Sequence, residues 1–488
     1  MGLQTTADFI ARHAQAQPGA LAVLDHGRPV TRQQLKQDLA QACHVLQKLG
    51  ASAGTVVALI CPNAYQHWLL VLACEQLGAV SDGLLDLQHE AWATLHQRAD
   101  LLVTTVPLPA TPACVTHRLA PEWLQPPAAG VPQPAPATPA LPVNAAARVA
   151  RSSGTTGTPR RMLLTRQALD HRVRSWVALL QLHEHSRYLL TLQLAASTAC
   201  YQAHACARSG AVLVLAPAVN AWQAVAQYGV THLFCLPGLL GQWLGTLPTA
   251  WHPPPALHVF CGGASLPPAL RQDALARLAT AVTEVYASNE AGVTASSDGE
   301  PGTGLRLRPG CDAEVVDEQG QPLPRGQTGH IRLRTPGMVH GYLDGHDHQP
   351  HFRDGWFYPG DIGTVPDPQH LYVAGRATDV MNLGGVKLLP QTIEAQLVSD
   401  QVPAHELAVC SLPDARGLEE VWVALCGQAA AHQDQVLKAL EPVCQELWWV
   451  RFRVVQLDSV NPQAPAKLSR RALRETLAGL ASGAHAPA

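Results

Sequence analysis

Apolar residues near the N-terminus form two kinds of run. They recur at helical spacing over 35–49, and Thr31 with Gln34 predicts a capping box at the start of that helix. The β-branched run 55–60 predicts a buried strand, and a second helical pattern covers 65–77. Strands and helices that alternate through short links indicate a parallel sheet covered by helices.

A proline-rich stretch interrupts this alternation at 107–142, where eleven prolines fall within 36 positions. Proline lacks the amide donor that a helix interior or a central strand requires. We therefore expect an extended surface connection of partly polyproline character. A ligand for a proline-recognising domain is the alternative interpretation.

The alternation then resumes. The elements expected next are strands at 212–215, 233–236 and 259–260 and a helix over 267–278 with proline in its first turn. From 305 onward, short strands such as 313–317 and 330–334 alternate with Gly and Pro turns, which predicts a small β subdomain. The final part of the chain has a separate pattern of helix and strand, ending in a helix over 470–480.

These patterns predict an α/β protein with two domains. The N-terminal domain, 1–375, should combine β-sheets flanked by helices with the small β subdomain, and the proline-rich connection lies inside it. The C-terminal domain, 379–488, should be a small α+β lid. No internal repeat is present.

Composition narrows the class of protein. The chain has 488 residues, of which 47% are hydrophobic and 15% charged, which excludes disorder or coiled coil for the whole chain. A net charge of −3 argues against a nucleic-acid partner. No apolar run is long enough to span a membrane, and no secretory signal is evident. The twelve cysteines contain no CxxC pair, so we expect buried thiols in a reducing, cytoplasmic compartment.

The most informative segment is 151–161, RSSGTTGTPRR. Its glycines allow the backbone to approach a ligand, and its hydroxyls and amides supply many donors for polyphosphate oxygens. The lysine of the common phosphate-binding P-loop motif is absent. A Ser/Thr/Gly turn without a ligand is the alternative interpretation.

SSGTTGTP resembles the phosphate-binding signature of the adenylate-forming superfamily, which includes acyl- and aryl-CoA synthetases, peptide-synthetase adenylation domains and firefly luciferase. Further motifs that are similar to those of this superfamily follow in its order. They are CGGASLPP (261–268), VYASNEAG (285–292), HGYLD (340–344), DGWFYPGDIG (354–363), GRATDVMNLGGVKLLPQTIE (375–394) and NPQAPAKLSRRAL (461–473). Together they cover about 20–480.

The resemblance implies a set of ATP-binding residues. Phosphate contacts would come from Ser152, Ser153, Gly154, Thr155, Thr156, Gly157 and Arg160. Gly263, Ala264 and Asn289 would line the nucleotide site, and Tyr286 would stack on adenine. Asp361 would accept hydrogen bonds from both ribose hydroxyls, and Arg376 would contact ribose or phosphate.

The resemblance also implies catalytic and moving parts. Glu290 would hold Mg2+, and Lys467 would stabilise charge on the forming acyl phosphate. The C-terminal domain would rotate about Thr378 and bring Gly384 and Gly385 to the thiol channel. The alternative for Glu290 is a surface carboxylate, and for Lys467 a solvated lysine at the start of a helix. The alternative for Tyr286 is a tyrosine packed in the core.

Several positions depart from the superfamily pattern. The unusual residues are Arg160, Ala287, Asn289, His330, Pro359, Thr378 and Ala466. Pro359 removes a hydroxyl and a backbone donor, and Arg160 keeps the charge of the usual lysine with another donor geometry. Because Glu290, Asp361, Arg376 and Lys467 all remain, we expect a divergent active enzyme rather than an inactive relative.

The acid-binding region is unusual in lacking charge. The stretch 192–202 contains no carboxylate, which disfavours an α-amino acid because its buried ammonium would be unpaired. Small residues suggest an open acyl pocket lined by Ala195, Ala196, Ser197, Cys261 and Gly262. An aryl or medium-length aliphatic acid would fit. His346, His348 and His351 form HxHxxH, for which a Zn2+ site is a less favoured interpretation.

The predicted function is therefore an AMP-forming carboxylic acid–thiol ligase. It would use ATP and Mg2+ to convert the acid to acyl-AMP and pyrophosphate, and then transfer the acyl group to CoA. The first alternative is a stand-alone adenylation enzyme that loads the phosphopantetheine of an acyl or peptidyl carrier protein in trans, since no carrier domain follows Ala488. The second is a catalytically silent nucleotide- or acyl-binding relative. The oligomeric state is not indicated.

Overall fold

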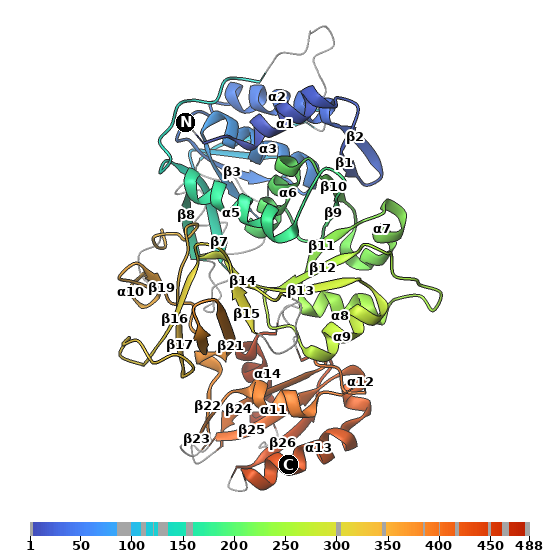
Figure 1. The fold of residues 1–488 in the computed structure, drawn as a ribbon, viewed down its shortest axis with the longest axis vertical. Helices are drawn as coiled ribbons and strands as arrows, with labels where there is room; N and C mark the ends of the chain where they lie inside the picture. The colour runs from blue at the N-terminus through green and yellow to red at the C-terminus, as the bar shows by residue number, and fades with distance from the viewer. Residues whose placement is uncertain are drawn as a thin grey trace.

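The fold comes from a computed structural model. It describes residues 3–84, 99–108, 114–120, 122–124, 135–152, 160–298, 304–343, 348–383, 386–399, 401–414, 419–447, 450–460 and 468–483. Two large sheets build the N-terminal part, and smaller sheets follow at the C-terminal end of the molecule (Figure 1). The predicted α/β fold class is confirmed.

The six-stranded sheet has the order β6-β5-β3-β4-β7-β8. Its strands are β3 (Val56–Ile60), β4 (Val80–Gly83), β5 (Leu101–Thr104), β6 (Val115–Arg118), β7 (Ala146–Ser152) and β8 (Arg160–Thr165). Only the β7–β8 pair is antiparallel. The strand β6 corrects the expectation for the proline-rich stretch, because the proline-free segment between its prolines pairs with β5 at the sheet edge, where proline flanks are tolerated.

A fifteen-stranded sheet forms the centre of the molecule. Its parallel part contains β1 (Leu21–Asp25), β9 (Arg187–Leu190), β10 (Val212–Leu215), β11 (His232–Cys235), β12 (His258–Gly262) and β13 (Ala281–Ser288). Strand β2 (Arg28–Thr31) pairs antiparallel with β1. The predicted strands are thus confirmed with shifts of a residue or two at their ends.

The predicted small β subdomain is the antiparallel continuation of this same sheet. Its strands are β14 (Gly292–Ser296), β15 (Leu305–Leu307), β16 (Asp312–Val316), β17 (Thr328–Arg334), β18 (Phe352–Arg353), β19 (Trp356–Phe357), β20 (Asp361–Asp367) and β21 (His370–Arg376). They enclose a hydrophobic cluster that includes Val315, Ile331 and Phe357. The hydrogen bonds of β15 to β14 and β21 connect this layer to the parallel part.

Helices cover both faces of the parallel strands and fill the space between the two large sheets (Figure 1). They are α1 (Thr6–Ala16), α2 (Arg32–Lys48), α3 (Ala64–Leu77), α5 (Arg166–Leu180), α6 (Ser197–Ser209), α7 (Ala221–Tyr228), α8 (Pro237–Gly245) and α9 (Pro268–Arg277). The short α10 (His348–His351) lies instead beside β18 and β19 (Figure 1). Helix α3 is buried on all sides, with eleven of its fourteen residues inaccessible, as expected for a helix that is apolar all round. Consequently the polar side chains of His67 and Gln76 lie inside the core.

The predicted capping box at α2 is only half correct. The Thr31 hydroxyl accepts a hydrogen bond from the backbone N–H of Gln34 at 3.1 Å. The Gln34 side chain does not return to the cap, because its amide donates to Asp38 at 2.7 Å. A complete capping box occurs instead at α1, between Thr5 and Asp8.

The C-terminal segment has hydrophobic clusters of its own, drawn from residues 381–477. Its elements are β22 (Met381–Leu383), β23 (Val386–Leu388), α11 (Pro390–Leu397), β24 (Leu407–Pro413), β25 (Glu419–Leu425), α12 (Gly427–Ala431), α13 (Gln433–Glu446), β26 (Phe452–Gln456) and α14 (Arg470–Gly483). They lie together at one end of the molecule (Figure 1). The exact division between 375 and 379 stays a prediction.

No helix among the described residues is long and apolar enough to cross a membrane. The described part of the chain also contains free cysteines only, most of them buried.

Candidate active site

The segment around Glu290 connects β13 to β14 and is held by a buried arginine. Arg172 of α5, fully inaccessible, donates to the backbone carbonyls of Asn289 and Glu290 at 2.8 and 2.9 Å. A third bond, 2.8 Å long, reaches the carbonyl of Gly337. The side chain of Asn289 in turn donates to the carbonyl of Arg151 at 2.8 Å. The motif segment is thereby fixed against the strand that leads into the predicted phosphate loop.

The carboxylate of Glu290 is buried and has one hydrogen-bond donor beside it. The hydroxyl of Tyr342 donates to its Oε1 at 3.0 Å. Burial and the Glu290 charge both raise the pKa of Tyr342 above its usual value, so this phenol remains protonated and donates. Because the Tyr342 hydroxyl is neutral, this hydrogen bond adds no positive charge beside the carboxylate.

Arg160 lies beside this pair. Its guanidinium stands 5.2 Å above the ring centre of Tyr342, and its Nη1 donates to Nε2 of His351 at 2.9 Å. Because arginine can only donate, the ring proton of His351 is on Nδ1, where it bonds the Tyr358 carbonyl at 3.1 Å. His351 thus orients Arg160 in the structure, and this is the contact observed for the last histidine of the HxHxxH pattern. His346 and the side chain of His348 lie outside the described residues.

A second cluster contains Asp361, Tyr286 and Arg376. The hydroxyl of Tyr286 donates to Oδ2 of Asp361 at 2.5 Å, and Nε of Arg376 lies 3.0 Å from Oδ1. Burial, and then the charge of Asp361, raise the pKa of Tyr286 well above its usual value. Arg376 is half exposed, and its Nη1 also donates to the carbonyl of Pro359 at 2.5 Å. The structure therefore brings the predicted ribose, adenine and phosphate residues of this group together.

The glycines at the end of β12 lie where only glycine fits. A Cβ on Gly262 would stand 2.7 Å from the carbonyl oxygen of Val285, and Gly263 has a φ of +84°. The loop that follows is held by Glu284, whose Oε1 accepts a bond from the N–H of Leu266 at 3.0 Å. Cys261 is buried next to this turn. The predicted nucleotide and acyl residues 261–264 thus lie on a tightly packed strand end.

The other part of the predicted acyl pocket, 195–197, begins α6. Ala195 lies against Gly83 of β4, where a Cβ would meet the Ala195 Cα at 3.2 Å. The carbonyl of Ala195 accepts a hydrogen bond from Arg148 at 3.3 Å. Ser197 is buried and is the first residue of the helix.

Several predicted residues lie outside the described part of the chain. These are Ser153, Gly154, Thr155, Thr156, Gly157, Gly384, Gly385 and Lys467, together with the side chain of Ser152. Their roles stay predictions. Thr378 lies in a short 3-10 turn, Ala377–Asp379, and its carbonyl accepts a bond from Arg474 of α14 at 3.4 Å.

Sequence reasoning missed the charged side chains beneath the site. Arg151 forms a bidentate pair with Asp82, with contacts of 2.7 and 2.9 Å. Arg148 and Arg172 are almost completely buried. The available signal was the occurrence of charged residues inside apolar strand and helix runs, which indicates a buried ion pair or a binding role.

The residues present fit a nucleotide with a hard cation. No group of three His, Cys, Asp or Glu side chains among the described residues could hold a metal ion by itself. Glu290 nevertheless supplies one buried carboxylate, and Mg2+ is commonly held by one or two carboxylates together with phosphate oxygens. The carboxylate of Asp361 retains acceptor capacity, because each oxygen has two lone pairs.

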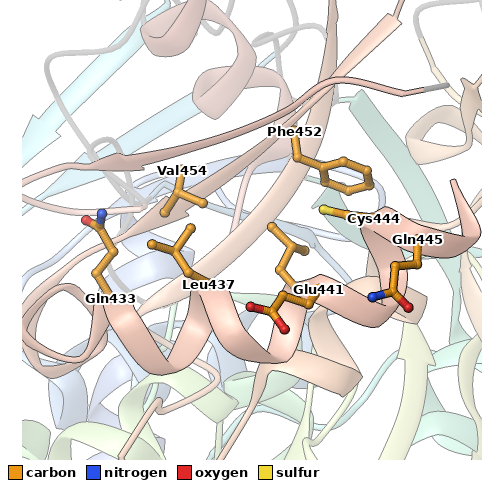
Figure 2. Close-up of a pocket in the computed structure, with 8 residues that line it drawn as sticks. Gln433, Leu437, Glu441, Cys444, Gln445, Phe452 and Val454 are labelled. Atoms are coloured by element: carbon orange, nitrogen blue, oxygen red, sulfur yellow. The ribbon is translucent and has the colours of Figure 1, made fainter. Parts of the chain in front are cut away.

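A groove of about 670 Å3 lies elsewhere, between α13 and β26. Figure 2 shows Leu437 on the helix pointing toward Val454 on the strand, with Phe452 farther along the same strand. None of the predicted site residues lines this groove. Its size therefore does not make it the candidate active site.

Comparisons with known proteins agree with the geometry. A fatty acid–[acyl-carrier-protein] ligase, ScoC, from Streptomyces coeruleorubidus is 25% identical over 521 residues, covering 98% of this chain and 97% of the relative. A sulfoacetate–CoA ligase from Cupriavidus necator is 28% identical over 465 residues, with 89% and 90% covered. The structure of ATP-bound MatB from Rhodopseudomonas palustris matches with a TM-score of 0.82 at 22% identity, over 97% of this chain and 99% of MatB.

The fold and the clustered motif residues define an adenylate-forming enzyme. Residues 10–343 match the AMP-binding enzyme family, and the chain belongs to that family. It is accordingly an ATP-dependent acid–thiol ligase.

Proposed function

We propose that this protein activates an aryl or medium-length aliphatic carboxylic acid with ATP and Mg2+ and transfers the acyl group to CoA. In the first step a carboxylate oxygen attacks the α-phosphorus, and the bond to the pyrophosphate oxygen breaks, which gives acyl-AMP. In the second step a thiolate attacks the acyl carbon and AMP leaves. The observation that carries the proposal is the buried Glu290 carboxylate, held by Tyr342 beside Arg160.

Each group has a physical task in the proposed first step. Asp361 and Tyr286 hold the ribose and adenine, so the α-phosphate is presented in one position. Arg160 faces the β- and γ-phosphates and stabilises the charge of the departing pyrophosphate. Mg2+ bound at Glu290 would neutralise phosphate charge. Lys467 would contact the reacting carboxylate from the C-terminal domain.

In this proposal the acyl group lies between the two small-residue segments, Ala195 to Ser197 and Cys261 to Gly262. The absence of a carboxylate there disfavours an α-ammonium group on the acid. Two relatives act on very different acids by their names, a fatty acid and sulfoacetate, so relatedness alone does not choose the substrate.

A carrier protein is the second candidate acceptor. The relative ScoC, which is matched over nearly its whole length, is named as an acyl-carrier-protein ligase. Both acceptors present the same phosphopantetheine thiol, so the chemistry of the second step is shared. The two acceptors differ in the group that carries the phosphopantetheine, which is a nucleotide in CoA and a protein domain in the carrier.

The test is pyrophosphate release with ATP and Mg2+ over a panel of aryl, short, medium and long acids, with Lys467→Ala as the control. Acid-dependent release that the variant loses supports the proposal. Thioester formation with CoA or with phosphopantetheinylated carrier protein then identifies the acceptor. ATP binding without acid-dependent release would contradict the proposal and favour a silent relative.

A further inference from the structure

Arg148 is a buried cation next to the predicted acyl pocket. It lies on β7, is 1% exposed, and donates from Nη1 to the Ser81 hydroxyl at 3.2 Å and from Nη2 to the Ala195 carbonyl at 3.3 Å. Its Nε has no hydrogen-bond partner. Both acceptors are neutral, so neither compensates the positive charge. Burying a guanidinium without a counter-charge is strongly unfavourable, so a native fold rarely tolerates it without a function.

The carboxylates near Arg148 are engaged elsewhere. Asp82, one residue beyond Ser81, is paired with Arg151 at 2.7 Å. Glu75 of α3 contacts His204 at 3.5 Å and Arg208 at 3.9 Å. Among the residues that the structure describes, no carboxylate pairs with Arg148. Neither of these carboxylates therefore compensates the charge of Arg148.

Two further features point to the same place. Helix α6 begins at Ser197, and its N-cap, Ala196, provides no side-chain acceptor, so the N–H groups of the first turn are not capped by a side chain. His67 of α3 is also buried, and its Nε2 has no partner. Gly83 of β4 lies next to both His67 and Ala195, because a Cβ on Gly83 would stand 3.2 Å from His67 Nε2 and from the Ala195 Cα. These distances show that Gly83 packs closely against the imidazole and the residue before α6, and that a side chain there would crowd both.

We propose that Arg148 and the N-terminus of α6 form a subsite for a second anionic group on the acid substrate, a carboxylate or a sulfonate at the end remote from the reacting carboxylate. This inference rests on the proposed function, because it places the acyl chain along Ala195 to Ser197. Arg148 Nε and the first-turn N–H groups donate to the anion, which supplies the missing counter-charge. His67 Nε2 accepts a hydrogen bond from a hydroxyl group where the tail carries one.

Among the described residues, Cys200 could neutralise Arg148 instead: although burial alone would raise the pKa of its thiol, the charges of Arg148 and His204 lower it. It lies one turn into α6 and contacts His204, with Sγ 3.7 Å from Nδ1. A thiolate at Cys200 would leave no charge for a ligand. The Cys200→Ser variant removes that possibility while keeping the size of the side chain. If the substrate anion pairs with Arg148, this variant keeps its preference for acids with two anionic groups.

The experiment compares acids in pairs with the wild-type enzyme. Each short α,ω-dicarboxylic acid, sulfo-carboxylic acid and para-carboxybenzoate is matched with the monoacid in which a methyl group replaces the distal anion. Acid-dependent pyrophosphate release should favour the dianion by about 100-fold in kcat/KM, since a site built for a polar group rejects an analogue that lacks it. Equal or better activity with the methyl analogues would overturn the inference and leave the proposed function intact. No release with any acid would overturn the proposed function itself.

Arg148→Met keeps the length of the side chain and removes the charge. We expect it to lose about 100-fold in kcat/KM on the dianion and less than about threefold on the matched monoacid. Arg32→Met is the matched control, because Arg32 is also buried and donates to a carbonyl, that of Gly210 at 3.0 Å. An equal loss on both acids in Arg148→Met would overturn the subsite. Should that variant not fold, the wild-type comparison of paired acids decides alone.

Discussion

The guanidinium of Arg160 donates to Nε2 of His351 across 2.9 Å, which fixes a residue at which lysine is usual in related enzymes. The ring of His351 is itself held by the Tyr358 carbonyl. A flexible arginine that is already oriented loses less entropy when phosphate binds. His351, the last histidine of the HxHxxH pattern, therefore positions Arg160 in this structure.

Removing the contact between His351 and Arg160 should weaken ATP binding more than it slows the adenylation step. We expect His351→Ala to raise the KM for ATP about five- to tenfold with a smaller change in kcat, because about 1 kcal/mol of charge-assisted hydrogen bonding is lost. His351→Gln should restore much of the affinity, because its amide oxygen can accept from Arg160. Steady-state kinetics measures both. Unchanged KM in His351→Ala would argue against the positioning role.

The hydrogen bond from Tyr342 to Glu290 predicts a change in metal dependence. Tyr342→Phe removes the donor at Oε1 and keeps the ring beneath Arg160. We expect the Mg2+ concentration for half-maximal activity to rise a few-fold, since the carboxylate is less well oriented. Chelation of Mg2+ should abolish activity in both proteins. A Mg2+ dependence identical to that of wild type would show that Tyr342 does not position the carboxylate.

Asp361 should determine nucleotide affinity. Asp361→Asn replaces one acceptor oxygen with a donor that faces the Tyr286 hydroxyl or Arg376. We expect ATP binding to weaken by at least about 30-fold, equivalent to about 2 kcal/mol, as measured by calorimetry. Tyr286→Phe, which keeps the ring but removes the bond to Asp361, should weaken it less. Comparable losses in both variants would contradict the ribose role.

The buried pair of Glu75 and His204 predicts a loss of stability at high pH. Although burial alone would lower it, contacts with Cys200 and Glu75 raise the pKa of His204 to about 9. A histidine whose folded pKa is raised contributes stability that is present below its unfolded pKa of 6.5 and is lost as pH rises through 9. We expect the free energy of unfolding to fall by up to about 3 kcal/mol across this window.

Urea unfolding at several pH values measures this effect, with His204→Gln as the control. The variant should be less stable near pH 6.5 and should show a flatter profile up to pH 9. Parallel profiles for the two proteins would mean that His204 is not the titrating group.

Helices and strands with a clear apolar pattern could be predicted from the sequence. The burial of polar and charged side chains could not. The pattern of α3 predicted a helix, but it could not show that both faces are covered, so His67 and Gln76 were not expected in the core. The edge strand β6 was missed because prolines flank a short unbroken run. The clustering of Asp361 with Tyr286 followed from motif resemblance, whereas the buried Arg148 depends on packing between α6 and two strands.

The central claim is formation of an acyl adenylate, and it can be observed directly. Purified enzyme is mixed with ATP, Mg2+ and an acid in the absence of any thiol, and the bound products are analysed by mass spectrometry. The account predicts acyl-AMP and pyrophosphate with wild type and neither product with Glu290→Gln or Lys467→Ala. ATP that binds and remains intact with every acid would contradict it.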